Sequence, residues 1–176
     1  GQVVHDTLIV KSFDGTAQQT LDVTITGTNE PAKISGAAVG SVAEDGTLTA
    51  GGTLTVTDPD SGQSVFLEPD NLAGTYGWFA FNAQTGVWGY SLDNGQLAVQ
   101  ALAGGQVVHD TLTVTSFDGT ASQTIDVAIA GNNDAPSAVL LTTAVSSIVE
   151  NTAVPAPIKV ADIAVTDIDG GIHTLA

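Results

Sequence analysis

The sequence predicts an all-β protein built from Greek-key β-sandwich units in tandem, with one short helix. Three observations lead to this fold class: Thr and Val alternate with polar residues in short runs, Gly, Asp and Asn interrupt these runs, and one long stretch of sequence occurs twice. Alternation with a period of two is typical of strands that bury one face. Several short strands per 100 residues favour a sandwich.

The repeat sets the domain organisation. The octapeptide GQVVHDTL occupies residues 1–8 and returns at 105–112, and aligning residues 1–32 with 105–136 gives 22 identities in 32 positions. A period of 104 residues is longer than a solenoid unit and indicates whole domains in tandem. We therefore expect the end of one unit at 1–32, a complete unit at 33–136 and the start of a third at 137–176.

Within the complete unit, the alternation predicts strands at 39–43, 53–57, 64–68, 76–82, 87–92, 107–116 and 122–130. Their inward phase gives the core candidates Trp88, Tyr90, Leu92, Val108, Leu112, Val114, Ile125, Val127 and Ile129. Helical spacing occurs in residues 96–104, where Leu97, Ala101 and Leu102 share one side. One or two helical turns are expected to bridge the two sheets there.

Composition limits the function classes. The chain has 19 Asp and Glu against 3 Lys and Arg, a net charge of −16, so it repels phosphate backbones and anionic head groups. Nucleic acid and membrane insertion are not expected, whereas hard cations such as Ca²⁺ suit a surface rich in carboxylate oxygens. The absence of cysteine excludes disulfides and thiolate zinc sites. The absence of methionine makes us expect an interior piece of a longer polypeptide.

Residues 33–136 carry a family resemblance. The run GTYGWFAFNAQTGVWGYSLDNGQLAVQALAGGQVVHDTLTVTSFDGTASQTIDVAIAGNNDAP resembles a VCBS repeat, with the aromatic hairpin, the AVQAL helix and the DGT turn in order. The later SIVENTAVPAPIKVADIAVTDIDGG resembles the opening of a cadherin-like repeat. The resemblance implies Ig-like or cadherin-like sandwiches in a large, secreted bacterial (RTX-type) surface adhesin. It also implies an extracellular location, with neighbouring repeats of the same chain as partners.

The same resemblance implies calcium at the joints between domains. In such arrays a Glu on the first strand, an Asp-x-Asp pair after the second strand and an Asn-acid pair in the linker hold the ion. The matching residues are Glu44, Asp58 and Asp60 in the middle unit, Glu150, Asp167 and Asp169 in the third, and Asn29, Glu30, Asn133 and Asp134 in the linkers.

These residues are expected to gather at two joints. Asp58 and Asp60 should face the Asn29 linker, and Asp167 and Asp169 should face the Asn133 linker. Glu44 is less specific to one joint, but the resemblance implies the Asn133 joint, because in cadherins the first-strand Glu serves the site at the far end of its own domain. Asp-Pro-Asp-Ser-Gly is also a favourable β-turn without any metal, because Asp caps turns and Pro presets φ. Both interpretations of that segment stay open at the level of sequence.

The remaining motifs favour structure over catalysis. His5 and His109 stand beside Asp6 and Asp110 at equivalent repeat positions, but no nucleophile accompanies them, so no enzyme is expected. By phase, His109 should face solvent, while Asp110 should point to the core side and be hydrogen-bonded. Asp118 in FDGT is expected to build a hairpin turn.

Two function classes remain. The first is a calcium-stiffened extender of an extracellular adhesin. The second is a glycan- or protein-binding module, because Tyr76 and Trp78 fall on the face of their strand opposite Phe79 and Phe81. That aromatic pair can alternatively pack against a neighbouring loop. The two partial end units are expected to be less well packed, and can alternatively complete each other as a permuted sandwich.

Overall fold

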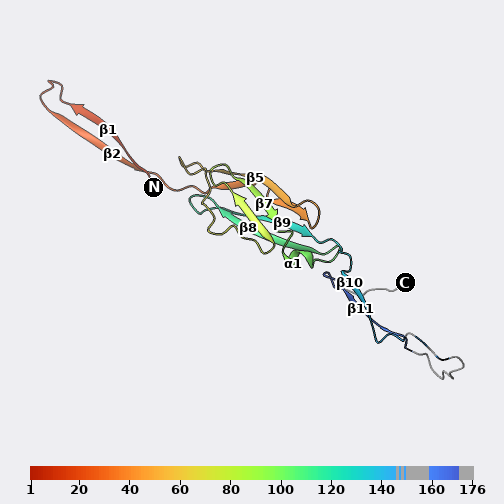
Figure 1. Ribbon diagram of the computed structural model, residues 1–176. Helices are drawn as coiled ribbons and strands as arrows, with labels where there is room; N and C mark the ends of the chain where they lie inside the picture. The colour runs from red at the N-terminus through yellow and green to blue at the C-terminus, as the bar shows by residue number, and fades with distance from the viewer. Residues whose placement is uncertain (146, 148, 150–158, 171–176) are drawn as a thin grey trace.

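The computed structural model describes residues 1–145, 147, 149 and 159–170, which form an elongated molecule with a central sandwich between two hairpins (Figure 1). The elements in chain order are β1 (Val3–Lys11), β2 (Gln18–Thr26), β3 (Lys33–Gly36), β4 (Val39–Ala43), β5 (Thr49–Thr57), β6 (Gly77–Phe81), β7 (Val87–Leu92), α1 (Leu97–Gln100), β8 (Val107–Thr115), β9 (Ser122–Ala130), β10 (Ala138–Thr142) and β11 (Asp162–Thr166).

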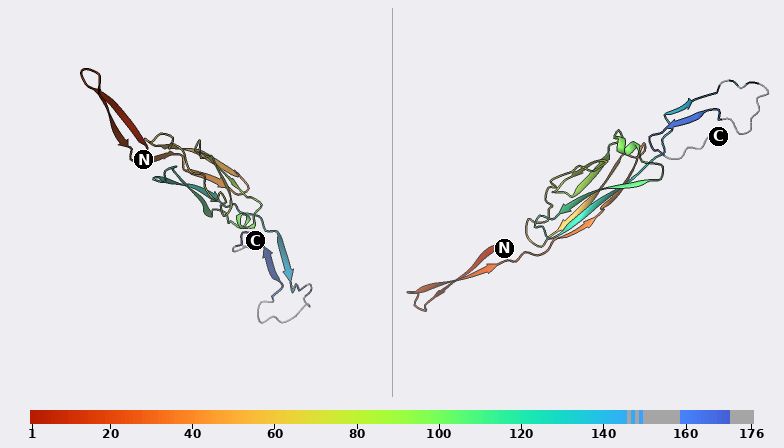
Figure 2. Two further views of the ribbon diagram at one scale, coloured as in Figure 1. Left: turned by 90° about the vertical axis from the view of Figure 1, so that its left-hand side faces the viewer. Right: turned by 90° about the horizontal axis from the view of Figure 1, so that it is seen from below.

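The central unit is a sandwich of two sheets, which face each other in both views of Figure 2. One sheet has the order β3-β5-β7-β6 with antiparallel pairs, and the other has the order β4-β9-β8, in which β4 runs parallel to β9. After β5 the chain crosses to the outer edge of β8 before it returns to β6 in the first sheet. This crossing gives the Greek-key arrangement that the sequence predicts, and the all-β fold class is confirmed.

Three of the expected strands, at 39–43, 87–92 and 122–130, have the predicted bounds. The expected strand at 64–68 is wrong: a single bridge joins Phe66 to Ser116 there, flanked by the bonds Leu67 N–H to Thr115 O and Phe117 N–H to Val65 O. Pro69 follows closely and has no N–H to extend the ladder. The alternation analysis also missed β3, which is only four residues long.

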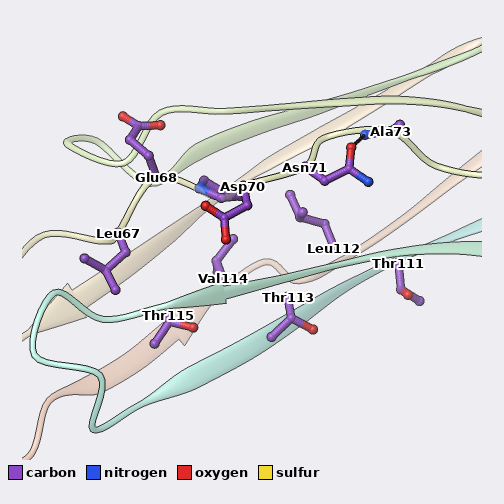
Figure 3. A pocket seen from close by; sticks show the side chains of 11 residues that line it. Leu67, Glu68, Asp70, Asn71, Ala73, Thr111, Leu112, Thr113, Val114 and Thr115 are labelled. Carbon is purple, nitrogen blue, oxygen red and sulfur yellow. Dashed lines mark hydrogen bonds between the residues drawn. The ribbon is translucent and has the colours of Figure 1, made fainter.

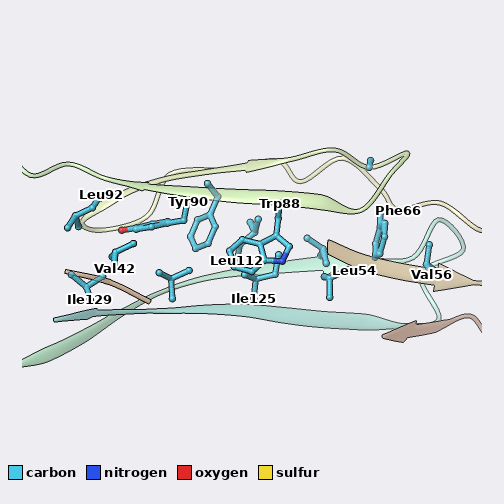
Figure 4. Packing of buried hydrophobic residues seen from close by; sticks show 14 of the residues in the cluster. Val42, Leu54, Val56, Phe66, Trp88, Tyr90, Leu92, Leu112, Ile125 and Ile129 are labelled. Atoms are coloured by element: carbon cyan, nitrogen blue, oxygen red, sulfur yellow. The ribbon is translucent and has the colours of Figure 1, made fainter. Parts of the chain in front are cut away.

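The core lies between the two sheets, around Trp88 and Tyr90 (Figure 4). Tyr90 packs against Phe79 with ring centroids 4.9 Å apart, and the Trp88 indole N–H donates to the carbonyl of Ala37 at 2.7 Å. Every core candidate named from the sequence is buried except Val108, which is partly buried. The period-two phase therefore identified the inner faces of β7, β8 and β9.

The helix has one turn, within the one or two turns that the sequence predicts for residues 96–104. In α1 and the turn after it, Val99 and Leu102 are buried, whereas Leu97 is exposed. The expected inner face of Leu97 and Ala101 is therefore wrong, because the helix has a single turn and Ala101 already has non-helical backbone angles. No helix among the described residues is long and apolar enough to cross a membrane.

The two end segments form separate two-stranded sheets, β1-β2 and β10-β11, at opposite ends of the molecule (Figure 1). Among the described residues the two sheets do not pair with each other, so the described strands do not form the permuted sandwich. The β1-β2 hairpin has the same register as β8-β9, but all of its residues are exposed. The residues that β8 and β9 bury, such as Ile125, correspond to exposed residues here, such as Leu21.

Candidate metal centres at the two joints

The first joint lies between the β1-β2 hairpin and the central sandwich. The Glu30 N–H in the linker donates to Asp60 Oδ2 at 2.9 Å, and the Asp60 N–H donates to Asp58 Oδ1 at 2.8 Å. Asp58 Oδ2 is buried and has no hydrogen-bond partner. The Asn29 amide reaches the carbonyl of Glu30. The structure thus brings the Asp-x-Asp pair against the linker.

The second joint, between the sandwich and β10, repeats this pattern. The Asp134 N–H donates to Asp169 Oδ2 at 2.7 Å, and the Asp169 N–H donates to Asp167 Oδ1 at 3.1 Å. The Asn133 amide donates to the carbonyl of Asp134 at 2.9 Å, and Asp169 Oδ1 is buried without a partner. The two joints therefore share one hydrogen-bond scheme, although their sequences differ in several positions.

Glu44 adds a further carboxylate to the second joint. Only 2% of its surface is exposed, its Oε2 accepts from the Asn132 N–H at 3.0 Å, and its Oε1 has no partner. Burial raises the pKa of Glu44, the Asn132 bond opposes this, and the carboxylates of Asp134, Asp45 and Asp169 raise it further. The resemblance implied the Asn133 joint for Glu44, and the bond from the Asn132 N–H places it there.

The same crowding affects Asp134, whose pKa is raised first by its desolvation and then by the carboxylates of Asp169, Asp45 and Asp167. Asp45 has a positive φ of 51° and is held by Asn94, whose amide donates to Asp45 Oδ1 at 2.7 Å. The second joint therefore concentrates negative charge that no nearby Lys or Arg in the described part of the chain offsets.

These residues fit a calcium ion in chemistry but are not arranged around one. Calcium takes oxygen ligands, and each joint presents a buried carboxylate oxygen without a partner: Asp58 Oδ2 at the first, and Glu44 Oε1 and Asp169 Oδ1 at the second. Within the described residues, no three His, Cys, Asp or Glu side chains converge closely enough to hold a metal. Glu150 lies outside the described residues.

Asp118 is a residue at the first joint that the sequence analysis had placed only in a turn. It does build the β8-β9 turn, accepting from Ser116 Oγ at 2.7 Å and Thr120 Oγ1 at 2.7 Å. Its Oδ2 also accepts from the Asn29 amide at 3.0 Å, 89 positions away in sequence. Bonds from Ser116, Thr120 and Asn29 hold the pKa of Asp118 well below its usual value.

One further bond joins this turn to the linker, from the Ala32 N–H to Thr120 Oγ1 at 2.8 Å. The signal that could have found this contact is the turn's recurrence as SFDGT at residues 12–16 and 116–120. The hairpin turn by itself also explains why SFDGT recurs. The contact between this turn and the linker could therefore be found only in the three-dimensional structure.

The two histidines occupy equivalent surface positions. His109 Nδ1 lies 2.8 Å from Asp126 Oδ1 and His5 Nδ1 lies 3.0 Å from Asp22 Oδ1, with all four side chains about half exposed. His109 therefore faces solvent, as its phase predicts. Both contacts bridge neighbouring strands of a hairpin.

A hollow of about 430 Å³ lies between the loop 67–73 and the free edge of β8 (Figure 3). Its rim carries the exposed carboxylates of Glu68 and Asp70, and Figure 3 shows that Asp70 is directed toward the hollow while Glu68 points away. None of the candidate calcium ligands lines it. Acidic side chains beside a free strand edge discourage pairing with another chain, which gives this rim a structural explanation.

Comparison with known proteins identifies the class. Residues 29–131 match the bacterial cadherin-like domain family, which covers more than half of the chain, so the chain belongs to that family. Cadherin-like domains are adhesion-type modules. No curated protein sequence matches the chain significantly.

Among solved structures, the chain is similar to protocadherin gamma B7 extracellular cadherin domains 1–4, at 18% identity and a TM-score of 0.45. That alignment covers 97% of this chain and 51% of the protocadherin chain, so this chain spans about half of its length.

Proposed function

We propose that this chain is part of a tandem array of extender modules in a large extracellular bacterial adhesin of the RTX type, and that calcium stiffens its joints. In this proposal residues 1–32 end one VCBS-like repeat, 33–136 form a complete one, and 137–176 begin a cadherin-like repeat. The array spaces an adhesive region away from the cell for attachment or biofilm formation. Export by a type I secretion system is part of the same proposal.

One observation carries the proposal: Glu44 is almost fully buried at the second joint with its Oε1 unpartnered, and burial together with the charges of Asp134, Asp45 and Asp169 raises its pKa. A buried carboxylate among like charges is destabilising unless a cation offsets it. Bound calcium would supply that positive charge. The residues that would hold it are Glu44, Asn133, Asp134, Asp167 and Asp169 at the second joint and Asn29, Glu30, Asp58 and Asp60 at the first.

The joint geometry supports a mechanical role for such an ion. Each Asp-x-Asp pair receives a backbone N–H from the linker, so the pair is already held against the linker. An ion bound to both would restrict rotation about the linker.

The proposal is tested by calorimetry on the full chain with calcium, with magnesium at equal ionic strength, and with chelator. Calcium at about one hundred times its Kd should stabilise the chain by about 2.7 kcal/mol. Glu44→Gln and Asp169→Asn should reduce the calcium-induced shift in Tm, whereas Glu68→Gln, on the rim of the hollow beside β8, should not. Small-angle scattering should report a longer, less flexible particle with calcium. Equal Tm shifts in all variants would refute the assignment.

A further inference from the structure

A second candidate surface lies on the outer face of the β3-β5-β7-β6 sheet, away from the core. Strand pairing places Thr49, Ser91 and Trp78 in one row across β5, β7 and β6, and Gly51, Gly89 and Ala80 in the next row. The first row carries two hydroxyls and an indole, and the second carries nothing larger than a methyl group. We call this surface the outer trough.

The outer trough is hollow. A depression of about 400 Å³ is lined by Thr49, Trp78, Ala80, Gly89 and Ser91 among others, and a neighbouring one of about 370 Å³ shares Ala80 and Gly89 and extends to Val87. Trp78 stands 56% exposed beside them. The sequence analysis paired Trp78 with Tyr76, but Tyr76 is partly buried against the core, so the indole stands without that partner.

The absence of a side chain at Gly89 is the most informative feature of the outer trough. Glycine in a central strand costs stability, and it often marks a place where another molecule approaches closely. The fold does not need glycine here: its φ lies outside the left-handed region, and an added Cβ would meet only the Ala50 carbonyl oxygen at 3.9 Å. By contrast, a Cβ on Gly51 would lie 2.9 Å from the Trp88 carbonyl oxygen. The missing side chain at Gly89 therefore keeps the outer face open without serving the core.

Charge indicates the kind of ligand. The chain has a net charge of −16, yet every residue that lines the two depressions, all within the described part of the chain, is uncharged. An aromatic face beside hydroxyl groups suits a ring that offers C–H bonds on one side and hydroxyls at its edge. We propose that the outer trough binds an uncharged glycan, with a pyranose ring stacked on Trp78 and its hydroxyls bonded by Thr49 and Ser91.

A protein partner fits this surface less well. Stable protein interfaces bury on the order of 1,000 Å² or more with an apolar centre. Beyond Trp78 and Val87 the outward residues of this sheet are small or polar, including Thr53 and Thr55 on β5. The proposed glycan site does not depend on calcium. It can therefore be tested independently of the proposal that calcium stiffens the joints.

Fluorescence of the full chain tests the proposal, because the chain has two tryptophans and Trp88 is only 2% exposed. Acrylamide should therefore quench Trp78 selectively. The probes are cellohexaose, maltohexaose, mannohexaose, chitohexaose and a galactan oligomer, with an oligogalacturonate as the charged control. At least one neutral probe should bind saturably and protect Trp78 from quenching, with or without chelator.

Variants separate the contribution of stacking on Trp78 from that of the open space over Gly89. Trp78→Ala removes the fluorophore that reports binding, so its affinity is measured by calorimetry, and the glycan should bind about tenfold or more weakly. Gly89→Thr should weaken binding as much while it keeps the indole and the fold, because the added side chain fills the outer trough. Val39→Ala, which truncates an exposed apolar residue on β4, should bind as the unchanged chain does. Failure of every neutral probe, binding that survives Gly89→Thr, or a Trp78-dependent dimer in sedimentation would each overturn the proposal.

Discussion

The phenolic O–H of Tyr90 donates a 2.7 Å hydrogen bond to Oδ2 of Asp110, and both side chains are buried between the sheets. Tyr90 belongs to β7 of one sheet and Asp110 to β8 of the other, so the bond crosses the sandwich. The same carboxylate accepts from the N–H groups of Thr75 and Tyr76 at 2.8 and 2.9 Å. One acidic side chain therefore ties the segment before β6 to both sheets.

Alkaline pH should reduce the stability that folding gains from this protonated tyrosine. Burial, the hydrogen bond to Asp110 and its negative charge raise the pKa of Tyr90 above the usual 10.0. A group whose pKa is raised by folding contributes stability that is complete below the unfolded pKa and is lost as pH rises toward the folded one. The free energy of unfolding should therefore fall above about pH 10. Urea titrations should show a smaller fall for Tyr90→Phe, and an equal fall in that variant would contradict the role given to this bond.

Asp110 should be far more important for stability than its repeat equivalent. Asp110→Ala leaves two backbone N–H groups and the Tyr90 hydroxyl without their acceptor, which should cost about 3 kcal/mol or more. Asp6→Ala removes the corresponding carboxylate from the exposed β1-β2 hairpin and should cost less than about 0.5 kcal/mol. Urea denaturation compares them directly, and equal losses would contradict the role given to Asp110.

The sequence predicted most of the central sandwich because its signals are local. Alternation located β4, β7 and β9 and the inner faces that bury Trp88, Tyr90 and Ile125. It could not predict that the segment near Phe66 would make a single bridge, because that depends on which strand edge it meets.

The joints were predictable in part. The motifs identified the carboxylates. The prediction that each Asp-x-Asp pair faces its linker agrees with the hydrogen bonds at both joints. The resemblance to cadherins directed Glu44 to the second joint, but the sequence could not predict its bond to Asn132, which depends on the turn after β4. It also missed the bond between Asn29 and Asp118, which joins residues that are distant in sequence.

The alternation of apolar and polar residues does not show whether the apolar face of a strand is buried. Ile125 and Leu21 provide a test. They occupy the same place in the repeat, yet Ile125 is fully buried and Leu21 is half exposed. Ile125→Ala should destabilise the central sandwich by about 3 kcal/mol, through lost apolar burial and the cavity that it leaves. Leu21→Ala should change the unfolding free energy of this chain by less than about 0.5 kcal/mol. A comparable loss for Leu21→Ala would mean that the hairpin face is covered in solution.

The β8-β9 turn should help to orient the first joint even without calcium. Asp118 accepts from the Asn29 amide, and Thr120 Oγ1 accepts from the Ala32 N–H, so the turn holds the linker at two points. Asp118→Ala removes one of these bonds and also the bonds that position Thr120. We expect the β1-β2 hairpin to sample a wider range of orientations relative to the sandwich.

Spin labels can measure this range, because the chain has no cysteine of its own. Labels at Gln19→Cys on β2 and Thr55→Cys on β5 should give a broader distance distribution in Asp118→Ala than in the parent, with chelator present. Asp14→Ala is the matched control, since its turn makes the same bonds to Ser12 and Thr16 but contacts no linker in the described part of the chain. An unchanged distribution in Asp118→Ala would show that the backbone bond from Glu30 to Asp60 is sufficient to orient the joint.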